Sequence, residues 1–501
     1  MKKEKNINRI ALIYPLGKNV VRKGLSLPVL YSYLKSKKIN SLIIDCPGLK
    51  YTFDMLNKDL DRYCPDIIGI SVAGTCMRRD TMEVCLRLRE IYPDKLILLG
   101  GVEVSSSPST YLDYCDIAVI GYGHETLRKI IELYPSNDVY KIPGIIYKKN
   151  GQTFSNPSTK EDINVPGPDF KCIPLEKYYS PIIFGNLKTD AVPNFFSLGC
   201  HYRCGFCKAD YMDQKVYLRD INMVIEEIKR DMRLYNKSYF VFYDPLFNSS
   251  KERVLEVCKK ITASGLKIRF LTSIAYKDFN DQIAIPLREA GCVALTLGLE
   301  SGSERILKSM GKNQNLRRDV IEKTHESLHR AGILVYTQTM LGFPEDDLQS
   351  MWDTINYASK LHTDSLGISL VVPYPGTLIE KQVKRLGIKL LCDISDADPY
   401  KPTFIPKGLD GIDMMKCKKF HLYHFYTRNR QRLESWLSRW KDKENYYQIR
   451  QEWEALYNIK GDMTFDYFCE YVYSSSESNK FVEPFLPDFS AAHKLEHKNK
   501  L

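Results

Sequence analysis

The sequence has no apolar run long enough to cross a membrane. A membrane-spanning helix needs about 20 consecutive apolar residues, and no stretch of the 501 residues approaches that length. Residues 1–15 carry lysines, as a signal peptide would, but their apolar stretch is too short and is interrupted by Asn and Arg. We therefore expect a cytoplasmic protein without a membrane span. Disulfides are rare in that compartment, so most of the 14 cysteines are expected to be reduced thiols.

The sequence also lacks the composition of a disordered chain. Hydrophobic residues make up 44% and charged residues 27% of the chain, which is enough to build full-sized cores. The length suggests about two to four domains. The formal net charge of +11 is compatible with an anionic ligand, nucleic acid or a membrane surface, and by itself selects none of them.

Residues 9–135 alternate between strand and helix signals. Short β-branched apolar runs predict strands at 9–14, 41–45, 66–72, 95–100 and 116–121, with helical patterns between them, for example at 25–38, 53–63 and 79–91. This alternation predicts an α/β domain over 1–150, a doubly wound parallel sheet of the flavodoxin-like kind. Such sheets bind ligands at the carboxyl ends of their strands, and here those ends carry small residues at 73–75, 100–107 and 121–126.

The rest of the chain divides into three further segments. Residues 151–190 are rich in Pro, Asn, Gly and Lys, and we interpret them as a linker that follows a short β extension. Over 191–390 the alternation restarts, with strands predicted at 194–198, 238–243, 267–272, 293–299, 333–340 and 365–371. The helices between them are predicted at 219–236, 249–264, 280–290, 316–331 and 346–361. These βα units predict a partial (β/α)6 barrel of the TIM type, with catalytic groups on its C-terminal rim. Residues 391–501 lack the alternation and are expected to be mainly helical.

Three cysteines stand close together in the segment CHYRCGFC, directly after the first predicted barrel strand. Cys200, Cys204 and Cys207 have the spacing C-x3-C-x2-C. Four thiolates complete the ligation of a cubane iron–sulfur cluster, and four protein ligands close a structural zinc site. The nearest other cysteines, Cys172 and Cys258, belong to the predicted linker and to a later helix. The spacing favours a [4Fe–4S] cluster with one open iron. A zinc site completed by a distant residue and a coincidence of buried thiols are the alternatives.

This motif and the segments after it resemble the radical S-adenosylmethionine (SAM) enzymes. CHYRCGFC is similar to the family's cluster motif, VFYDPLF to its second strand, and Glu300, Ser301 and Gly302 to its ESGS pattern. GFPEDD and PYPGT resemble the segments around the fifth and sixth strands, with Glu345 where the family usually has Gly. The resemblance covers nearly the whole barrel. It implies that the three cysteines hold a [4Fe–4S] cluster whose open iron binds SAM.

The resemblance also implies a chemistry and a role for four further residues. One electron from the reduced cluster would cleave SAM to methionine and a 5′-deoxyadenosyl radical, which abstracts a substrate hydrogen. Phe206 is expected beside the adenine and Asp244 at the SAM amino group. Glu300, with Ser301 beside it, is expected at the ribose or the methionyl end. Without the resemblance, Glu300 would be a carboxylate at a helix start and Asp244 an ordinary turn residue.

Residues 1–150 resemble the cobalamin (B12)-binding domain that precedes the barrel in one radical SAM subclass, the class B methyltransferase-like enzymes. PDIIGISVAGT, LLGGVEVSSS, DIAVIGYGHETL and IPGIIYKKNG match that domain in order and spacing. The family's GEGE is replaced by GYGHE, so Tyr122 and His124 stand in place of acidic residues. The motif D-x-H-x-x-G is absent, as is usual in this subclass, so no histidine of that motif would coordinate cobalt. Cys76 or Met77 would be the cap from below.

The resemblance assigns the lining of the cobalamin site to small residues at the strand ends. They are Thr75, Gly100, Gly101, Ser105, Gly121 and Gly123. The alternative is that these are ordinary βα loops of a flavodoxin-like module with an empty site.

The two resemblances together imply a cobalamin-dependent radical SAM methyltransferase. A methyl group from SAM would pass through cobalamin to an unactivated carbon or phosphorus of a substrate radical, which demands orientation more than acid–base chemistry. The alternatives are cyclisation, ring rearrangement or oxidation without methyl transfer, a tRNA methylthiotransferase-like enzyme, and a cobalamin or iron–sulfur sensor without enzymatic activity. The expected partners are a small-molecule or peptide substrate and a one-electron reductant of the flavodoxin or ferredoxin type. No nucleic-acid partner is expected.

The segment 412–458 is both basic and aromatic. This composition suits RNA or an anionic ligand, and it also suits an amphipathic helical cap with a solvated basic face. We prefer the cap, because C-terminal segments in the family resembled often close over the substrate.

Overall fold

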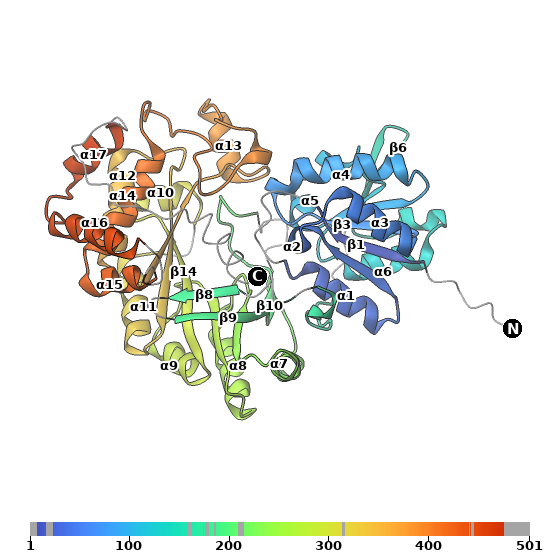
Figure 1. The fold of residues 1–501 in the computed structure, drawn as a ribbon, viewed down its shortest axis with the longest axis horizontal. Coiled ribbons are helices and arrows are strands. Elements are labelled where there is room, and N and C mark those ends of the chain that lie inside the picture. The colour runs from blue at the N-terminus through green and yellow to red at the C-terminus, as the bar shows by residue number, and fades with distance from the viewer. Residues whose placement is uncertain are drawn as a thin grey trace.

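The computed structural model contains two α/β units and a helical C-terminal segment (Figure 1). It describes residues 8–16, 24–157, 162–173, 175, 180–184, 187–208, 215–312, 316–439, 441 and 445–474. In Figure 1 the blue N-terminal unit lies beside the green-to-orange barrel, and the label of the short helix α5 (Val102–Ser106) stands on its side toward the barrel.

The N-terminal unit is built on a seven-stranded sheet in the order β2-β1-β3-β4-β5-β6-β7. Its strands are β1 (Ile10–Tyr14), β2 (Ser41–Asp45), β3 (Ile67–Ser71), β4 (Leu96–Gly100), β5 (Ile117–Val119), β6 (Ile145–Lys149) and β7 (Gln152–Asn156). Strands β1 to β5 pair in parallel, and β6 and β7 are antiparallel. The order 2-1-3-4-5 is that of flavodoxin-like sheets, so the fold predicted for this region is confirmed.

Helices cover both faces of this sheet. They are α1 (Ser26–Ser36), α2 (Cys46–Leu49), α3 (Phe53–Tyr63), α4 (Arg78–Ile91), α5 and α6 (His124–Leu133). Leu56 of α3 and Leu88 of α4 belong to one apolar core, whereas Leu34 of α1 and Ile130 of α6 belong to another. Strands covered on both faces read as continuous apolar runs, which is why the sequence pattern identified them.

The second unit is a curved sheet in the order β16-β15-β14-β13-β12-β9-β8. Its parallel strands are β9 (Leu187–Asn194), β12 (Tyr239–Phe242), β13 (Arg269–Ile274), β14 (Cys292–Glu300), β15 (Leu334–Leu341) and β16 (Ser365–Leu370), with β8 (Ser180–Phe184) antiparallel at the edge. Its helices are α7 (Ile221–Tyr235), α8 (Lys251–Ala263), α9 (Asp281–Glu289), α10 (Glu304–Ser309), α11 (Arg318–Arg330), α12 (Leu348–Lys360) and α13 (Leu378–Arg385). The partial (β/α)6 barrel is therefore confirmed.

The first barrel strand was predicted in the wrong place. Strand β9 ends at Asn194, where the prediction began, and Ser197–Leu198 forms β10, which pairs only with β11 (Tyr217–Leu218). The sequence of β9, LKTDAVPN, is polar and contains a proline, so it carries no apolar run to recognise. Strand β7 joins the first sheet and β8 the second, so strands occupy both ends of the region interpreted as a linker.

The C-terminal helices pack against the outside of the barrel. They are α14 (Met414–Thr427), α15 (Arg430–Ser438), α16 (Tyr446–Asn458) and α17 (Phe465–Tyr473), and α14 contacts α12 and β16. The aromatic side chains of the basic segment, such as Tyr426, Trp436 and Trp453, lie inside this core. Stacking on single-stranded RNA needs exposed rings, so these residues serve packing. Within the described chain, no helix combines the length and apolarity of a membrane span.

Candidate active site between two sheet edges

The loop that carries the cysteine trio, residues 199–208, follows β10 near the carboxyl ends of the barrel strands. It is folded on itself and against the barrel helices. The Cys207 amide donates to the Cys204 carbonyl (2.9 Å), and the Gly205 amide donates to the Met310 carbonyl (2.7 Å). A side chain at Gly205 would collide with that carbonyl and with Leu378. We call residues 199–208 the cluster loop.

The trio has the donor chemistry of an iron–sulfur site. Cys200 and Cys204 are partly exposed, Cys207 is exposed, and none of them forms a disulfide. Burial raises the pKa of the Cys204 thiol to about 12, and the cationic Lys312 acts against that rise. Among the described residues, no three His, Cys, Asp or Glu side chains converge as a single metal ion requires. A cubane takes each thiolate on a different iron, so its cysteine ligands do not have to converge on one point.

Glu300 stands at the carboxyl end of β14 in a strained conformation. Its φ is +62°, in the left-handed region that non-glycine residues seldom occupy, and such strain clusters at functional sites. The Lys312 ammonium holds its carboxylate at 2.9 Å and also donates to the Gly298 carbonyl. Glu300 and Lys312 are thus paired with each other, and both act electrostatically on the Cys204 thiol of the cluster loop. Sequence reasoning identified Glu300 but missed Lys312.

Asp244 and Ser301 make internal contacts. The Asp244 carboxylate accepts from the Phe196 amide (3.0 Å) and the Ser197 hydroxyl (2.6 Å), and burial raises its pKa to about 6. It thereby fixes the chain just before the cluster loop. The Ser301 hydroxyl bonds Thr354 and accepts from the Ser303 amide.

Phe206 packs in an apolar cluster with residues of α10 and α13, among them Ile306 and Ile379. In the sequence, Phe206 stands between Cys204 and Cys207. The SAM contacts assigned to Phe206, Asp244, Glu300 and Ser301 stay predictions.

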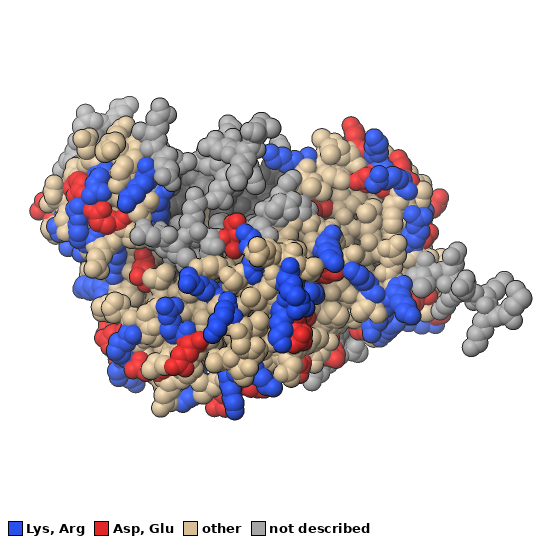
Figure 2. Space-filling view, turned by 60° about the horizontal axis from the view of Figure 1, so that its bottom comes forward, with Lys and Arg blue, Asp and Glu red and all other residues tan. Residues whose placement is uncertain are grey.

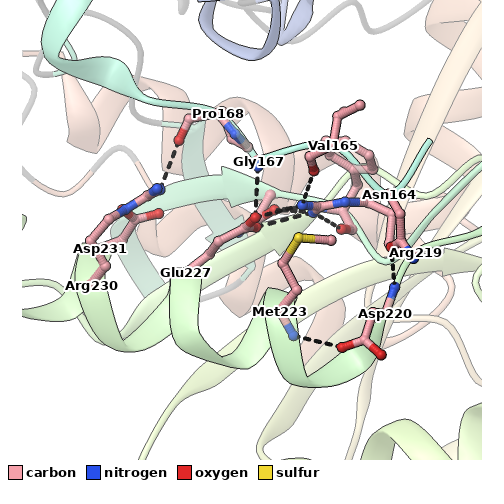
Figure 3. Close-up of polar contacts among 12 residues, drawn as sticks. Asn164, Val165, Gly167, Pro168, Arg219, Asp220, Met223, Glu227, Arg230 and Asp231 are labelled. Atoms are coloured by element: carbon pink, nitrogen blue, oxygen red, sulfur yellow. Dashed lines mark hydrogen bonds and ion pairs between the residues drawn. The ribbon is translucent and has the colours of Figure 1, made fainter. Parts of the chain in front are cut away.

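A buried ion pair between Arg219 and Glu227 lies against residues 164–168 of the segment that joins the two sheets (Figure 3). Arg219 and Glu227 form two hydrogen bonds, of 2.5 and 3.1 Å, with both side chains almost fully buried. Arg219 also donates to the Val165 and Phe195 carbonyls, and Glu227 accepts from the Gly167 amide. The pair thus holds residues 165–167, helix α7 and the end of β9 together.

The residues predicted to line cobalamin gather at the carboxyl edge of the first sheet. Gly101 has a φ of +105°, and a side chain there would strike the Val72 carbonyl. The Gly121 amide donates to the Ser105 hydroxyl (3.0 Å), so the loops after β4 and β5 are joined. Gly100 ends β4, Gly123 precedes α6, and open space surrounds the Cα of Gly121.

The two residues proposed as a cap from below differ in exposure. Met77 is buried in the apolar core of the first unit, whereas Cys76 is exposed. The thioether of Met77 packs in that core, which favours Cys76 of the two. Cys76 stays a prediction.

The two sheet edges meet at a group of four polar side chains, which we call the junction cluster. Lys208, the residue after Cys207, bonds the Thr75 hydroxyl (3.0 Å) and the Glu103 carboxylate. Arg78 binds the other oxygen of Glu103 at 2.5 Å. Burial alone would raise the pKa of Glu103, but Lys208, Thr75 and Arg78 together hold it below its usual value. Sequence reasoning found Thr75 and missed the other three residues.

The residues that replace the family's acidic pair also lie at this junction. The ring of Tyr122 contacts that of Tyr217 of β11 edge to face, with centroids 5.4 Å apart. His124 Nε2 bonds the Asp162 carbonyl at 2.8 Å. The substitutions thus connect the first unit to the segments that flank the barrel.

The chain matches two known domains. Residues 194–358 match the Radical SAM superfamily, and residues 23–131 match the B12 binding domain. The chain is 26% identical to "Uncharacterized methyltransferase PH0819" of Pyrococcus horikoshii, over 84% of this chain and 93% of that protein. It is 21% identical to the anaerobic magnesium-protoporphyrin IX monomethyl ester cyclase of Cereibacter sphaeroides, over 74% of this chain and 63% of that protein.

A solved structure has the same architecture. The radical SAM methyltransferase TsrM from Kitasatospora setae, with cobalamin and a [4Fe–4S] cluster bound, aligns with a TM-score of 0.67 over 93% of this chain and 99% of that chain. The identity is 14%, so the likeness concerns the fold.

The residues of both sheet edges fit the cofactors of these domains. Three accessible thiols on one loop suit a cluster with an open iron, and a glycine-lined sheet edge suits a large flat ligand. The cofactors are a [4Fe–4S] cluster, SAM and cobalamin. The chain thus combines a Radical SAM domain, at residues 194–358, with a B12-binding domain, at residues 23–131.

Proposed function

We propose that this protein is a cobalamin-dependent methyltransferase that acts on an unactivated carbon or phosphorus of its substrate. The observation that carries the proposal is the contact of Lys208, next to the predicted cluster ligand Cys207, with Thr75 and Glu103 at the predicted cobalamin edge. A methyl group passed between two cofactors requires them to share one cavity. When bound, the cluster with SAM supplies a substrate radical, and cobalamin supplies the methyl group.

The chain's own residues bind and orient in this proposal. Cys200, Cys204 and Cys207 hold the cluster, and Glu300, positioned by Lys312, lies where it would receive SAM. Asp244 acts by fixing the strand end before the cluster loop. On the opposite side, Thr75, Gly100, Gly101, Ser105, Gly121 and Gly123 form the cobalamin edge.

The remaining assignments follow from the same proposal. We propose domains at 1–150 and 191–390, joined by 151–190, with 391–501 as the C-terminal segment; β7 extends the first domain into the joining region, and β8 and β9 extend the second. The substrate is a small molecule or peptide, and a flavodoxin- or ferredoxin-type reductant delivers the electron in the cytoplasm. On the face shown in Figure 2, basic and acidic side chains are interspersed, as on an ordinary solvated surface.

A second candidate function keeps both cofactors but omits methyl transfer. It is favoured by the likeness to the cyclase of Cereibacter sphaeroides. The mass of the product separates the two, because methylation adds one methyl group and cyclisation removes hydrogen.

Anaerobic reconstitution of the full chain with iron, sulfide and hydroxocobalamin, followed by reduction in the presence of SAM, tests the proposal. We expect retained cobalamin and formation of 5′-deoxyadenosine. A protein that carries a full cluster and forms no 5′-deoxyadenosine would contradict the radical chemistry, and one that releases cobalamin on gel filtration would contradict the N-terminal site.

A further inference from the structure

The junction cluster contains one more cation than its carboxylate needs. Arg78 and Glu103 both belong to the N-terminal unit, and their 2.5 Å contact already neutralises the buried carboxylate. Lys208 comes from the barrel unit and binds the same carboxylate through its second oxygen. Burying a second charge is costly. Its presence therefore points to a task other than holding the N-terminal unit together.

Lys208 contacts three loops that carry different parts of the site. Its ammonium reaches Thr75 in the segment after β3 and Glu103 in the short helix α5 after β4. It also lies 5.6 Å from the ring centroid of Tyr374, in the loop after β16. Only 12% of the Lys208 side chain is exposed. A single side chain thus joins the cobalamin edge to the barrel rim.

Lys208 directly follows the predicted cluster ligand Cys207 in the chain, so its contacts influence the position of that ligand. Consecutive Cα atoms lie about 3.8 Å apart, so any displacement of Lys208 displaces Cys207. On the other side, Glu103 follows Gly101 by two residues, and its own amide donates to the Val72 carbonyl. The contact therefore transmits position from the predicted cobalamin edge directly to a predicted cluster ligand.

We propose that Lys208 is a positioning residue that sets the alignment of the cluster loop against the cobalamin edge, with Glu103 and Thr75 as its anchors. This inference rests on the proposed function, because alignment matters only where two cofactors cooperate. Lys208 acts through the loops it joins and touches no reacting atom.

The chain offers a matched control for this contact. Arg79 of the N-terminal unit pairs with Asp396 of the C-terminal segment at 3.0 Å, so it too bridges distant parts of the chain. This pair is exposed on both sides, at 61% and 52% of the side chains. Arg79→Met removes a bridging cation next to the junction cluster and keeps all four side chains of that cluster.

The first test uses the cofactor-free full chain and hydrogen–deuterium exchange. Lys208→Met is expected to speed exchange of the amides at 101–107 and 199–207 by about tenfold or more, since a local anchor is lost. Arg79→Met should leave both segments unchanged, and Lys208→Arg should restore protection. Exchange in Lys208→Met equal to that of the wild type would overturn the proposal, whether or not the proposed function holds.

The second test uses the reconstituted protein and the ratio of two products. One is 5′-deoxyadenosine, which needs only the cluster and SAM. The other is methyl label from SAM recovered on cobalamin, which needs both cofactors in register. Lys208→Met should lower the label-to-deoxyadenosine ratio by about 100-fold, with the ratio of Lys208→Arg close to that of the wild type. Because misfolded protein loses both products together, a change in their ratio reports on the alignment of the cluster loop with the cobalamin edge.

The outcomes separate this inference from the proposed function. If the wild type forms neither product, the proposed function fails and the exchange experiment alone decides the role of Lys208. If the wild type forms both and Lys208→Met keeps their ratio, the inference is wrong and the proposed function stands. Should Lys208→Met be insoluble, Lys208→Gln takes its place, with the same expectations.

Discussion

At the scale of single residues, the thiols of the cluster loop carry the most specific expectation. Cys204→Ala should abolish the iron–sulfur absorption of the reconstituted protein and leave cobalamin binding unchanged, because the cobalamin edge belongs to a different sheet. Cys64→Ala, at an exposed thiol of the N-terminal unit, is the control and should retain both. Iron content and the visible spectrum measure the result. Full iron content and undiminished SAM cleavage in Cys204→Ala would refute the assignment of the site.

Glu300 and Lys312 should behave as a pair that receives SAM. Glu300→Gln keeps the shape of the side chain but removes the charge that Lys312 neutralises. We expect the Kd for SAM to rise by about tenfold, the size of one charge-assisted hydrogen bond, with the cluster intact. Equilibrium dialysis with labelled SAM measures the change. An unaltered Kd would show that Glu300 does not contact SAM.

Ionisation of Asp346 makes the free energy of unfolding depend on pH, and the direction of the dependence follows from burial. Burial raises its pKa to about 6, against hydrogen bonds from Ser350, Phe343 and Gly342. Between its ordinary pKa and about pH 6 the folded state therefore binds more protons than the unfolded state, and stability falls as pH rises through this window. The Asn side chain of the Asp346→Asn variant cannot ionise, so the variant does not lose this stability as the pH rises.

Relative to the wild type, Asp346→Asn should gain roughly 1–3 kcal/mol between pH 4 and pH 7. Urea unfolding of the cofactor-free protein at several pH values measures this difference. A difference that stays constant across the range would contradict the burial argument for Asp346.

At the scale of elements, the buried pair of Arg219 and Glu227 fastens helix α7 to the end of β9. Arg219→Met leaves the Glu227 carboxylate buried without its partner, which should cost about 3–5 kcal/mol of unfolding free energy. The double substitution with Glu227→Met should cost less than Arg219→Met alone. Removing Arg317, whose pair with Asp319 is exposed, should change stability by less than about 0.5 kcal/mol. Equal changes in unfolding free energy for the Arg219 and Arg317 substitutions would refute the claim that the Arg219–Glu227 pair fixes α7 to the end of β9.

Helices and strands could be predicted where their burial requires a regular pattern of apolar residues in the sequence. Strands β12 to β16 and helices α7, α8, α9, α11 and α12 follow apolar runs and amphipathic periods, and the predicted ranges overlap the observed ones. Strand β9 escaped prediction because it is polar and contains Pro193, and its place is fixed by pairing with β12. Tertiary pairing, rather than local sequence, decided that element.

The site was predictable only in its contiguous motifs. The cysteine trio and Glu300 lie in recognisable segments, but Lys208 and Glu103 are 105 residues apart, and their contact exists only in the folded chain. The contact of Lys312 likewise depends on the left-handed backbone conformation of Glu300, which no sequence pattern predicts. Asp244 was expected to face SAM, whereas the structure gives it hydrogen bonds to Phe196 and Ser197.

At the scale of the whole molecule, the central claim is that two sheet edges face one reaction space. The flavodoxin-like unit and the half-barrel each present the carboxyl ends of their strands, and the junction cluster joins them. An arrangement of this kind serves transfer between two cofactors, since neither edge alone completes the site.

The most direct test of this claim follows the methyl group of SAM. The full chain, reconstituted anaerobically with iron, sulfide and hydroxocobalamin, is reduced in the presence of SAM deuterated in its methyl group, and cobalamin and nucleosides are analysed by mass spectrometry. The account predicts 5′-deoxyadenosine together with trideuteromethyl label on cobalamin. A protein with an intact cluster and bound cobalamin that places no label on cobalamin would contradict it.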